Sequence, residues 1–180
     1  MHDQVSTGNK TITLTAEWER NIYSVNYNLN GGSISGEKTE YSIISSDFTL
    51  PIPTRTGYYF TGWTGSNGST PQRTVTIPKG STGNKSYTAN WVAKQVTVKF
   101  YPNYGSNSPT SKTYTYGVGG NFSAITRTGY ILDGWSESAS ASEAAYSPTC
   151  AVVNSWINSK VGNNKTGTVN LYAIWSAGTF

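Results

Sequence analysis

The stretch RTGYYFTGW occupies residues 55–63, and a closely similar stretch, RTGYILDGW, occupies residues 127–135. Six of the nine positions are identical between the two stretches. Upstream of each stretch, YSVNYNLNGG at 23–32 matches VTVKFYPNYG at 96–105 in pattern and at nearly the same spacing. Self-similarity at a fixed period is the signature of a repeated structural unit, so this repeat decides the fold.

The ends of the copies match as well. SYTANW at 86–91 corresponds to NLYAIW at 170–175, and the wider spacing between these two segments means that the second copy carries an insertion. A third, partial copy, STGNKTITLTAEW at 6–18, opens the chain. The shared Ala-x-Trp motif comprises Ala16 and Trp18, Ala89 and Trp91, and Ala173 and Trp175.

These matches predict how the chain is divided. We expect residues 1–18 to be the C-terminal strand remnant of a preceding repeat, and therefore the chain to be cut from a longer array. Residues 19–92 form the first full repeat module and residues 93–180 the second. The insertion lies near 148–161, where Val153, Trp156, Ile157 and Val161 recur at helical spacing and predict a short amphipathic helix.

The remainder of each module reads as short strands. Val25, Tyr27 and Leu29 alternate with polar residues, which is the pattern of a half-buried strand. Asn30-Gly31-Gly32 then predicts a turn, because Asn and Gly tolerate positive φ. We expect further extended runs at about 38–50, 58–63, 74–78 and 86–91. In the second copy Asn103-Tyr104-Gly105 replaces the Asn-Gly-Gly turn, so we expect a looser hairpin there.

Composition supports a β-rich, ordered chain and excludes several functions. Aromatic residues make up 13% of the chain, whereas disordered chains are poor in them. The net charge of +4 is scattered rather than clustered, so nucleic-acid binding is not expected, and weak attraction to anionic glycans is the alternative. One cysteine allows no internal disulfide. No apolar stretch approaches the length of a membrane-spanning helix, so membrane insertion is not expected.

Catalytic machinery is not visible in the sequence. The lone histidine, His2, is at the terminus, so serine and cysteine nucleophiles have no plausible base. Cys150 lies in an apolar run and is expected to be an inert thiol. Among the acids only Asp133 lies in a repeated motif, and its counterpart is Thr61, which is a poor basis for a carboxylate pair. We therefore expect no enzyme, no cofactor and no metal site.

The pattern of strand, NGG turn, LPIPTRTGYYFTGW and a closing YTANW resembles the Listeria–Bacteroides repeat, the B-repeat type of internalins. The resemblance covers nearly the whole chain. It implies a β-rich α+β fold of tandem small β-grasp-like, ubiquitin- or SUMO-like, modules on a bacterial cell surface, wall-associated or secreted. It implies no catalytic residues. The repeat signature consists of Gly57, Tyr58, Gly62, Trp63, Ala89, Trp91, Gly129, Tyr130, Gly134, Trp135, Ala173 and Trp175.

Two functions are compatible with these features. The leading hypothesis is a non-catalytic spacer, stalk or adhesion segment, monomeric, whose partners are the neighbouring repeats of the same chain. The segment VAKQ at 92–95 is too short for free tumbling, so we expect an elongated rod. The alternative is a binding module for a host protein or glycan that uses exposed aromatics. Its candidate ligand-contacting residues are Tyr59, Tyr101, Tyr104 and Trp156.

Overall fold

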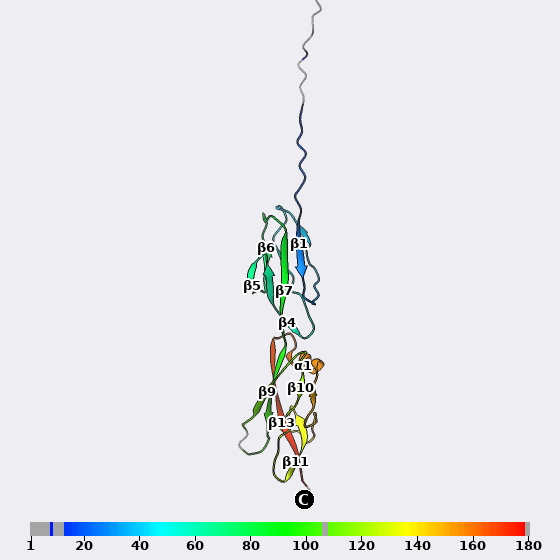
Figure 1. Ribbon diagram of the computed structural model, residues 1–180, viewed down its shortest axis with the longest axis vertical. Coiled ribbons are helices and arrows are strands. Elements are labelled where there is room, and N and C mark those ends of the chain that lie inside the picture. Colours follow the sequence, from blue (N-terminus) through cyan, green and yellow to red (C-terminus); the bar gives the residue numbers. More distant parts are fainter. Residues whose placement is uncertain (1–7, 9–12, 106–107, 179–180) are drawn as a thin grey trace, which may run out of the picture.

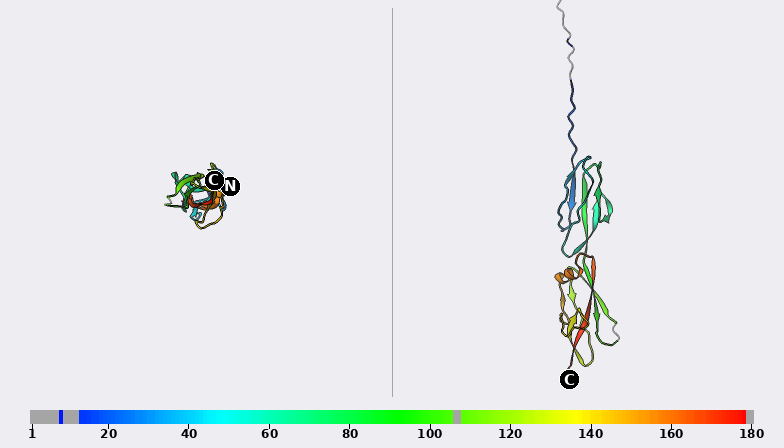
Figure 2. Two further views of the ribbon diagram at one scale, coloured as in Figure 1. Left: turned by 90° about the horizontal axis from the view of Figure 1, so that it is seen from below. Right: turned by 180° about the vertical axis from the view of Figure 1, so that it is seen from behind.

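The computed structural model describes residue 8 and residues 13–105 and 108–178. Two strand-rich modules lie end to end along one long axis, and the view down that axis shows a narrow cross-section (Figures 1 and 2). We call residues 23–93 the first module and residues 95–178 the second module. Each has its own sheet and its own cluster of buried residues.

The first module is built on a five-stranded sheet with the order β2-β1-β7-β4-β5. Its first and last long strands, β1 and β7, run parallel side by side, and the remaining neighbours are antiparallel. A separate two-stranded ribbon, β3–β6, closes the module. The strands are β1 (Tyr23–Asn28), β2 (Glu40–Tyr41), β3 (Phe48–Thr49), β4 (Tyr58–Gly65), β5 (Gly68–Gln72), β6 (Thr76–Ile77) and β7 (Lys85–Ala93).

The second module repeats this frame in a four-stranded sheet with the order β11-β13-β8-β9. Again the first and last strands, β8 and β13, are parallel, and a two-stranded ribbon, β10–β12, accompanies the sheet. A helix lies between the ribbon and the last strand. The elements are β8 (Gln95–Tyr101), β9 (Thr110–Thr115), β10 (Gly120–Asn121), β11 (Tyr130–Ser136), β12 (Ala151–Val152), α1 (Asn154–Val161) and β13 (Thr166–Ala177).

Aromatic residues that recur in both copies pack in the cores of the two modules. Trp63 and Trp135 are fully buried at equivalent positions, each against a phenylalanine, Phe60 or Phe100, in edge-to-face contact. Ala89 and Ala173 are buried beside them on the last strands. The closing tryptophans are half-buried, and their indole N–H groups donate to the carbonyl oxygens of Leu29 and Pro102. Packing of this kind gives a small module the apolar burial that its size makes scarce.

A glycine inside β4 and another inside β11 interrupt the pairing with the last strand. The register shifts between Phe60 and Gly62 and between Leu132 and Gly134, which is the bulge that an interior glycine indicates. Gly62 has φ +145° and Gly134 has φ +149°. A Cβ at Gly62 would lie 2.4 Å from Gln72 N, and one at Gly134 would lie 2.1 Å from Tyr146 O, so backbone crosses close to both glycines.

Several expectations about the elements need correction. The second-copy hairpin is the more regular one: β8 pairs with β9 over six residues, whereas β1 pairs with β2 over two. The sequence does not predict strand β5, because GSTPQ lacks an alternation of apolar and polar residues. In the structure all five of its residues are exposed. The helix begins at Asn154, since residues 151–152 pair as β12, and Val153 is exposed. Most of the expected strand remnant at 1–18 lies outside the described residues, so that prediction stays open; residues 13–22 are not assigned to a strand, and Leu14 and Trp18 are exposed.

Candidate functional site at the module junction

The two modules are joined by a single residue. Strand β7 ends at Ala93 and β8 begins at Gln95, so the chain passes from one sheet into the other through Lys94. The backbone N–H of Lys94 donates to Gly57 O of the first module at 3.0 Å. Its carbonyl oxygen accepts from Tyr116 N of the second module at 2.9 Å. The connecting peptide is therefore bonded to both modules.

The side chain of Lys94 is also held at the junction. The residue is only 8% exposed. Its Nζ donates to Asn158 Oδ1 at 3.0 Å and to the carbonyl oxygen of Gly162, at the C-terminal end of α1. The end of a helix carries partial negative charge, which favours a cation there. The inserted helix thus contributes directly to the joint.

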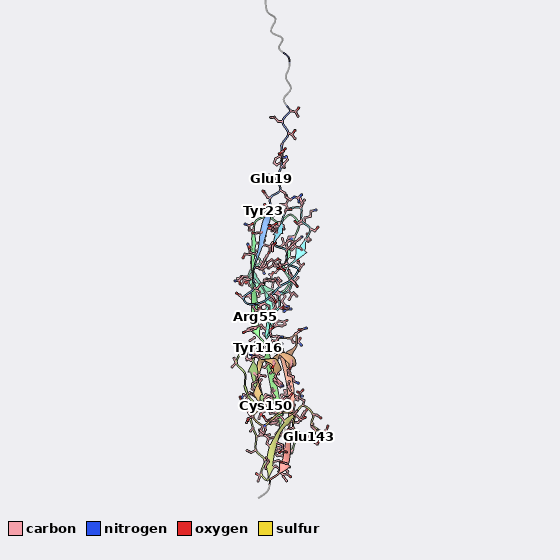
Figure 3. The ribbon with its side chains drawn as sticks, turned by 90° about the vertical axis from the view of Figure 1, so that its right-hand side faces the viewer. Glu19, Tyr23, Arg55, Tyr116, Glu143 and Cys150 are labelled. Carbon is pink, nitrogen blue, oxygen red and sulfur yellow. The ribbon has the colours of Figure 1, made fainter. Side chains whose placement is uncertain are left out.

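Aromatic contact completes the junction. Gly57, at φ +77°, lies under the ring of Tyr116, which leaves no room for a side chain because a Cβ would be 2.2 Å from the ring. The same ring meets Tyr58 edge to face at 5.8 Å between centroids. The guanidinium of Arg55 stacks over the ring of Tyr58, 3.9 Å from the ring centroid. Figure 3 shows Arg55 and Tyr116 on either side of the boundary.

A polar cleft of about 470 Å³ opens at this boundary. On the first-module side it is lined by the Gly31-Gly32-Ser33 turn and by Thr54 to Thr56. On the other side lie Lys94 and Asn158. A second cleft of about 240 Å³ shares Thr54, Arg55 and Lys94 and adds Arg73. The modules must be in contact for either cleft to form.

The structure does not bring the four aromatic candidates together on one patch. Tyr59 lies near the junction, lines the smaller cleft and is covered by the guanidinium of Arg73 at 4.7 Å. Tyr101 stacks on Tyr172 at 4.8 Å, on the sheet of the second module. Tyr104, 39% exposed, meets Trp175 edge to face at 5.8 Å. These last two candidates both belong to the second module, away from the junction.

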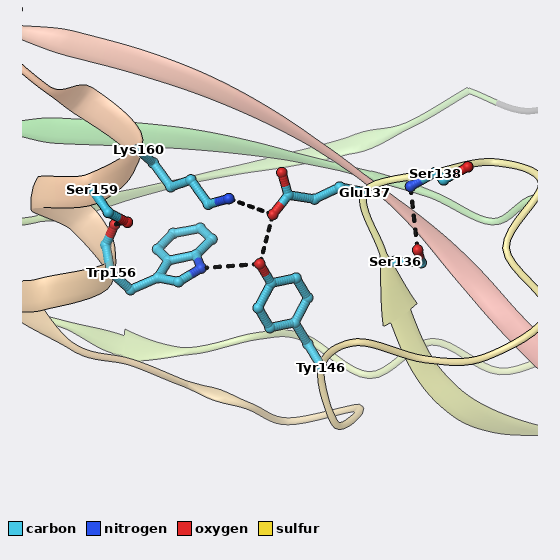
Figure 4. Close-up of polar contacts among 7 residues, drawn as sticks. All are labelled: Ser136, Glu137, Ser138, Tyr146, Trp156, Ser159 and Lys160. Carbon is cyan, nitrogen blue, oxygen red and sulfur yellow. Dashed lines mark hydrogen bonds and ion pairs between the residues drawn. The ribbon is translucent and has the colours of Figure 1, made fainter.

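Trp156, the fourth candidate, is half-buried and belongs to a polar tie between α1 and a loop (Figure 4). Its indole N–H donates to Tyr146 Oη at 3.4 Å, and that hydroxyl donates to Glu137 Oε1 at 2.6 Å. Lys160 Nζ lies 2.5 Å from the same carboxylate oxygen. The hydrogen bond that Lys160 donates lowers the pKa of the Glu137 carboxyl group. The same hydrogen bond raises the pKa of the Lys160 ammonium group.

The groups considered for catalysis have the following contacts. Cys150 is half-buried, and its thiol donates to the neighbouring carbonyl oxygen of Ala151 at 3.6 Å. Asp133 accepts from Ser176 Oγ at 2.8 Å. Over the part of the chain that the structure describes, no three His, Cys, Asp or Glu side chains are grouped as a metal site. His2 lies outside the described residues.

Gly57 and Tyr58 belong to the predicted repeat signature and Lys94 to the predicted connecting segment, but Arg55, Lys94 and Tyr116 were not predicted as site residues, although two signals were available. Lys94 falls on the same alternation as the buried Val96, Val98 and Phe100, so its parity places it on the inner face. Arg55 precedes Tyr58 in the same way that Arg127 precedes Tyr130, and the second pair repeats the stacking at 3.5 Å. Tyr116 carried no local signal, because its partner Gly57 belongs to the other module.

Comparison with known families agrees with the two-module arrangement. Residues 23–95 match the family described as "Divergent InlB B-repeat domain". Residues 97–174 match the "Listeria-Bacteroides repeat domain". The two matched segments meet at the junction residues, and together they take in both sheets.

Two relatives from Evansella cellulosilytica are similar to the chain. A "Putative Gly-rich membrane protein" is 29% identical over 186 residues, which covers 99% of this chain and 19% of the relative. A "Putative membrane protein" is 42% identical over 62 residues, covering 33% of this chain and 9% of the relative. The chain thus spans about a fifth or less of these relatives. Within the residues that the structure describes, no helix has the length and apolar character needed to cross a bilayer.

Proposed function

Residues 23–95 belong to the divergent InlB B-repeat family and residues 97–174 to the Listeria-Bacteroides repeat family, and from this premise we propose a rigid, non-catalytic spacer. The spacer would hold other parts of a bacterial surface protein apart, on the extracellular side. The membrane-protein names of the two relatives support a location at the cell envelope.

The observation that carries this proposal is that no flexible linker lies between β7 and β8. Only Lys94 separates the two strands. Its backbone is bonded to both modules, and its side chain is bonded to Asn158 and Gly162 of the second. A flexible linker of a few residues would let two modules tumble, whereas a bonded single residue transmits the direction of one strand to the next. Repeats that contact only their neighbours in this way extend as a rod.

Neighbouring repeats are the proposed partners, and two features at the outer ends of the described pair support this. Gly178 N donates to Gly129 O at 2.9 Å, which repeats the bond from Lys94 N to Gly57 O. At the opposite end Ile43, 49% exposed, follows Tyr41 by two residues, as Tyr116 follows the corresponding Tyr114 in the second module. One end therefore repeats a hydrogen bond of the junction, and the other exposes an apolar side chain.

We also propose that each module is a reduced β-grasp fold. The support is the strand order, in which the first and last strands form a central parallel pair flanked by antiparallel strands. The helix does not follow the usual β-grasp position, because α1 comes directly before the last strand, and no helix is found among residues 23–93.

Adhesion is the second candidate function. Its support is a set of exposed apolar side chains on the second module, where Tyr104 is 39%, Tyr130 is 43% and Ile131 is 55% exposed. The same side chains would be covered if a further repeat docked there. An isolated patch on a protein surface marks a binding site only where nothing else covers it.

Small-angle X-ray scattering of the whole chain tests the spacer. We expect one narrow, elongated distance distribution. Insertion of a short flexible Gly-Ser segment after Ala93 should broaden that distribution and shorten the average end-to-end distance. A matched control places the same segment in the turn at Ser66 and Asn67, between β4 and β5, which lies away from the junction and should leave the overall dimension unchanged. A compact particle, or equal effects of both insertions, would contradict the rigid joint.

A further inference from the structure

The junction gathers positive charge without a compensating acid. Arg55 and Lys94 both line the larger cleft, and Arg55, Arg73 and Lys94 line the smaller one. Among the described residues that line these clefts there is no Asp or Glu. The chain has only nine acidic residues, and one acid–base ion pair, Lys160 with Glu137, is formed in the described part.

Burial makes the charge of Lys94 the significant one. A lysine that is 8% exposed is unusual unless a counter-charge accompanies it. Its two acceptors, Asn158 Oδ1 and Gly162 O, are neutral groups. The end of α1 offers roughly half a negative charge, so a net positive charge remains at the cleft wall. An ammonium has three N–H donors, which leaves one to be directed at a ligand.

Arg55 supplies the matching group across the cleft. Its guanidinium lies over the ring of Tyr58 and close to the Gly31 backbone, where a Cβ would be 3.6 Å away. Stacking fixes the plane of the guanidinium and leaves its edge, with its paired N–H donors, free for a planar or tetrahedral oxyanion. No described carboxylate forms an ion pair with that edge.

We propose that this junction cleft binds the oxyanion groups of an acidic polysaccharide, carboxylate or sulfate. A polymer fits better than a single ion because the two clefts share Arg55 and Lys94, and Arg73 adds a third cation to the lining of the smaller one. Hydroxyl-bearing residues, Ser33, Thr54 and Thr56, line the larger cleft beside the cations and suit the hydroxyl groups of a sugar. The site exists only while the modules are stacked, but the spacer role does not depend on it.

Isothermal titration of the whole chain with sulfated dextran and with polygalacturonate tests the proposal. Neutral dextran controls for the sugar backbone, and inorganic sulfate controls for a free ion. The variants are Arg55→Gln and Lys94→Gln, both of which keep N–H donors while removing the charge. Arg127→Gln is the matched control, because Arg127 occupies the same repeat position and stacks on Tyr130 in the same way, away from the cleft.

We expect Arg55→Gln and Lys94→Gln each to weaken binding of at least one acidic polymer by about tenfold or more. Arg127→Gln should change the affinity by less than about twofold, and added salt should weaken binding by the unmodified chain. Equal losses from Arg55→Gln and Arg127→Gln would show diffuse attraction and overturn the proposal. So would no binding of either acidic polymer, or inorganic sulfate binding as tightly as the polymer.

Scattering measured on the same variants separates this proposal from the spacer. If the variants keep the elongated profile and lose binding, the site is supported independently of the joint. If they keep the profile and bind unchanged, the cleft proposal is wrong while the spacer stands. If Lys94→Gln bends the chain, Arg55→Gln decides alone, because the Arg55 side chain lies against Tyr58 and near Gly31, both of its own module. Retained binding by Arg55→Gln would then overturn the cleft.

Discussion

In both modules a backbone segment packs against the bulged strand, but the two modules use different segments of the chain for this. In the first, the backbone opposite Trp63 is supplied by the tight β4–β5 hairpin, which places Gln72 across from it. In the second, a loop of the chain brings Tyr146 to the equivalent place opposite Trp135. Both modules therefore cover the bulged strand, but only the second contains α1, which then becomes part of the joint through Asn158 and Gly162.

The two modules also differ in the hydrogen bonding of their central tryptophans, Trp63 and Trp135. The indole N–H of Trp135 donates to Pro148 O at 3.1 Å. The indole N–H of Trp63 is buried and has no partner among the described residues. The shared core position therefore has different polar surroundings in the two modules.

The largest expected effect tests whether the bulge is common to both modules. Gly62→Ala and Gly134→Ala should each lower the free energy of unfolding of their own module by more than about 3 kcal/mol, because the added Cβ meets rigid backbone. Urea unfolding followed by circular dichroism measures this. Gly36→Ala and Gly117→Ala are the controls: both glycines have positive φ but open space around them, so about 1 kcal/mol is expected. Costs as small as the controls would contradict a shared bulge.

A second comparison concerns the indole hydrogen bond. Trp135→Phe should cost about 1–2 kcal/mol more than Trp63→Phe, because it leaves the carbonyl of Pro148 without its donor, whereas Trp63 loses no bond. Both changes remove similar volume, so the difference between them isolates the polar contribution. The measurement is again urea unfolding, module by module. Equal costs would mean that Trp63 has a bonding partner in solution, such as water.

The smallest expected effect is a difference between the two modules in how their folding stability depends on pH. The pKa of Glu137 is lowered from its ordinary value of 4.5 by the hydrogen bond from Lys160. A lowered pKa in the folded state contributes stability above the unfolded pKa, and that stability is lost as pH falls through the folded value. Glu137 is 44% exposed and Lys160 26% exposed, so the contribution should be below about 1 kcal/mol.

Thermal unfolding at pH 7 and at about pH 3 checks this prediction. The second module should lose more stability on acidification than the first, and Glu137→Gln should abolish that extra loss. Glu143→Gln serves as the control, since that exposed carboxylate forms no ion pair within the described residues. If Glu143→Gln removes the difference equally well, the tie between α1 and the loop does not carry it.

Much of the fold was visible in the sequence because local patterns repeat. Alternation at 23–29, the aromatic strand at 58–63 and the Ala-x-Trp close identified the long strands. The short pairs were less accessible. Strand β5 has no buried residue, so hydrophobic periodicity cannot detect it, and the β3–β6 ribbon is only two residues long on each side.

The candidate site shows the limit of such reasoning more clearly. The four aromatic candidates were chosen because they lay off the repeat pattern or on the opposite strand face, yet Trp156 packs into the second module and Tyr59 is covered by Arg73. Whether an aromatic side chain is exposed depends on what the rest of the chain places over it. The junction cleft was missed for the same reason, since it joins Arg55 to Asn158 across two modules.

The sequence by itself determined the repeat, its strand-rich class, the family and the positions of the core tryptophans, because each of these is encoded in periodicity within a short segment. Tertiary structure alone decided that Lys94 is buried, that Tyr116 covers Gly57, and that the inserted helix takes part in the joint. Those contacts join residues far apart in the chain. Their energies come from burial and hydrogen bonding that exist only once both modules are folded and stacked.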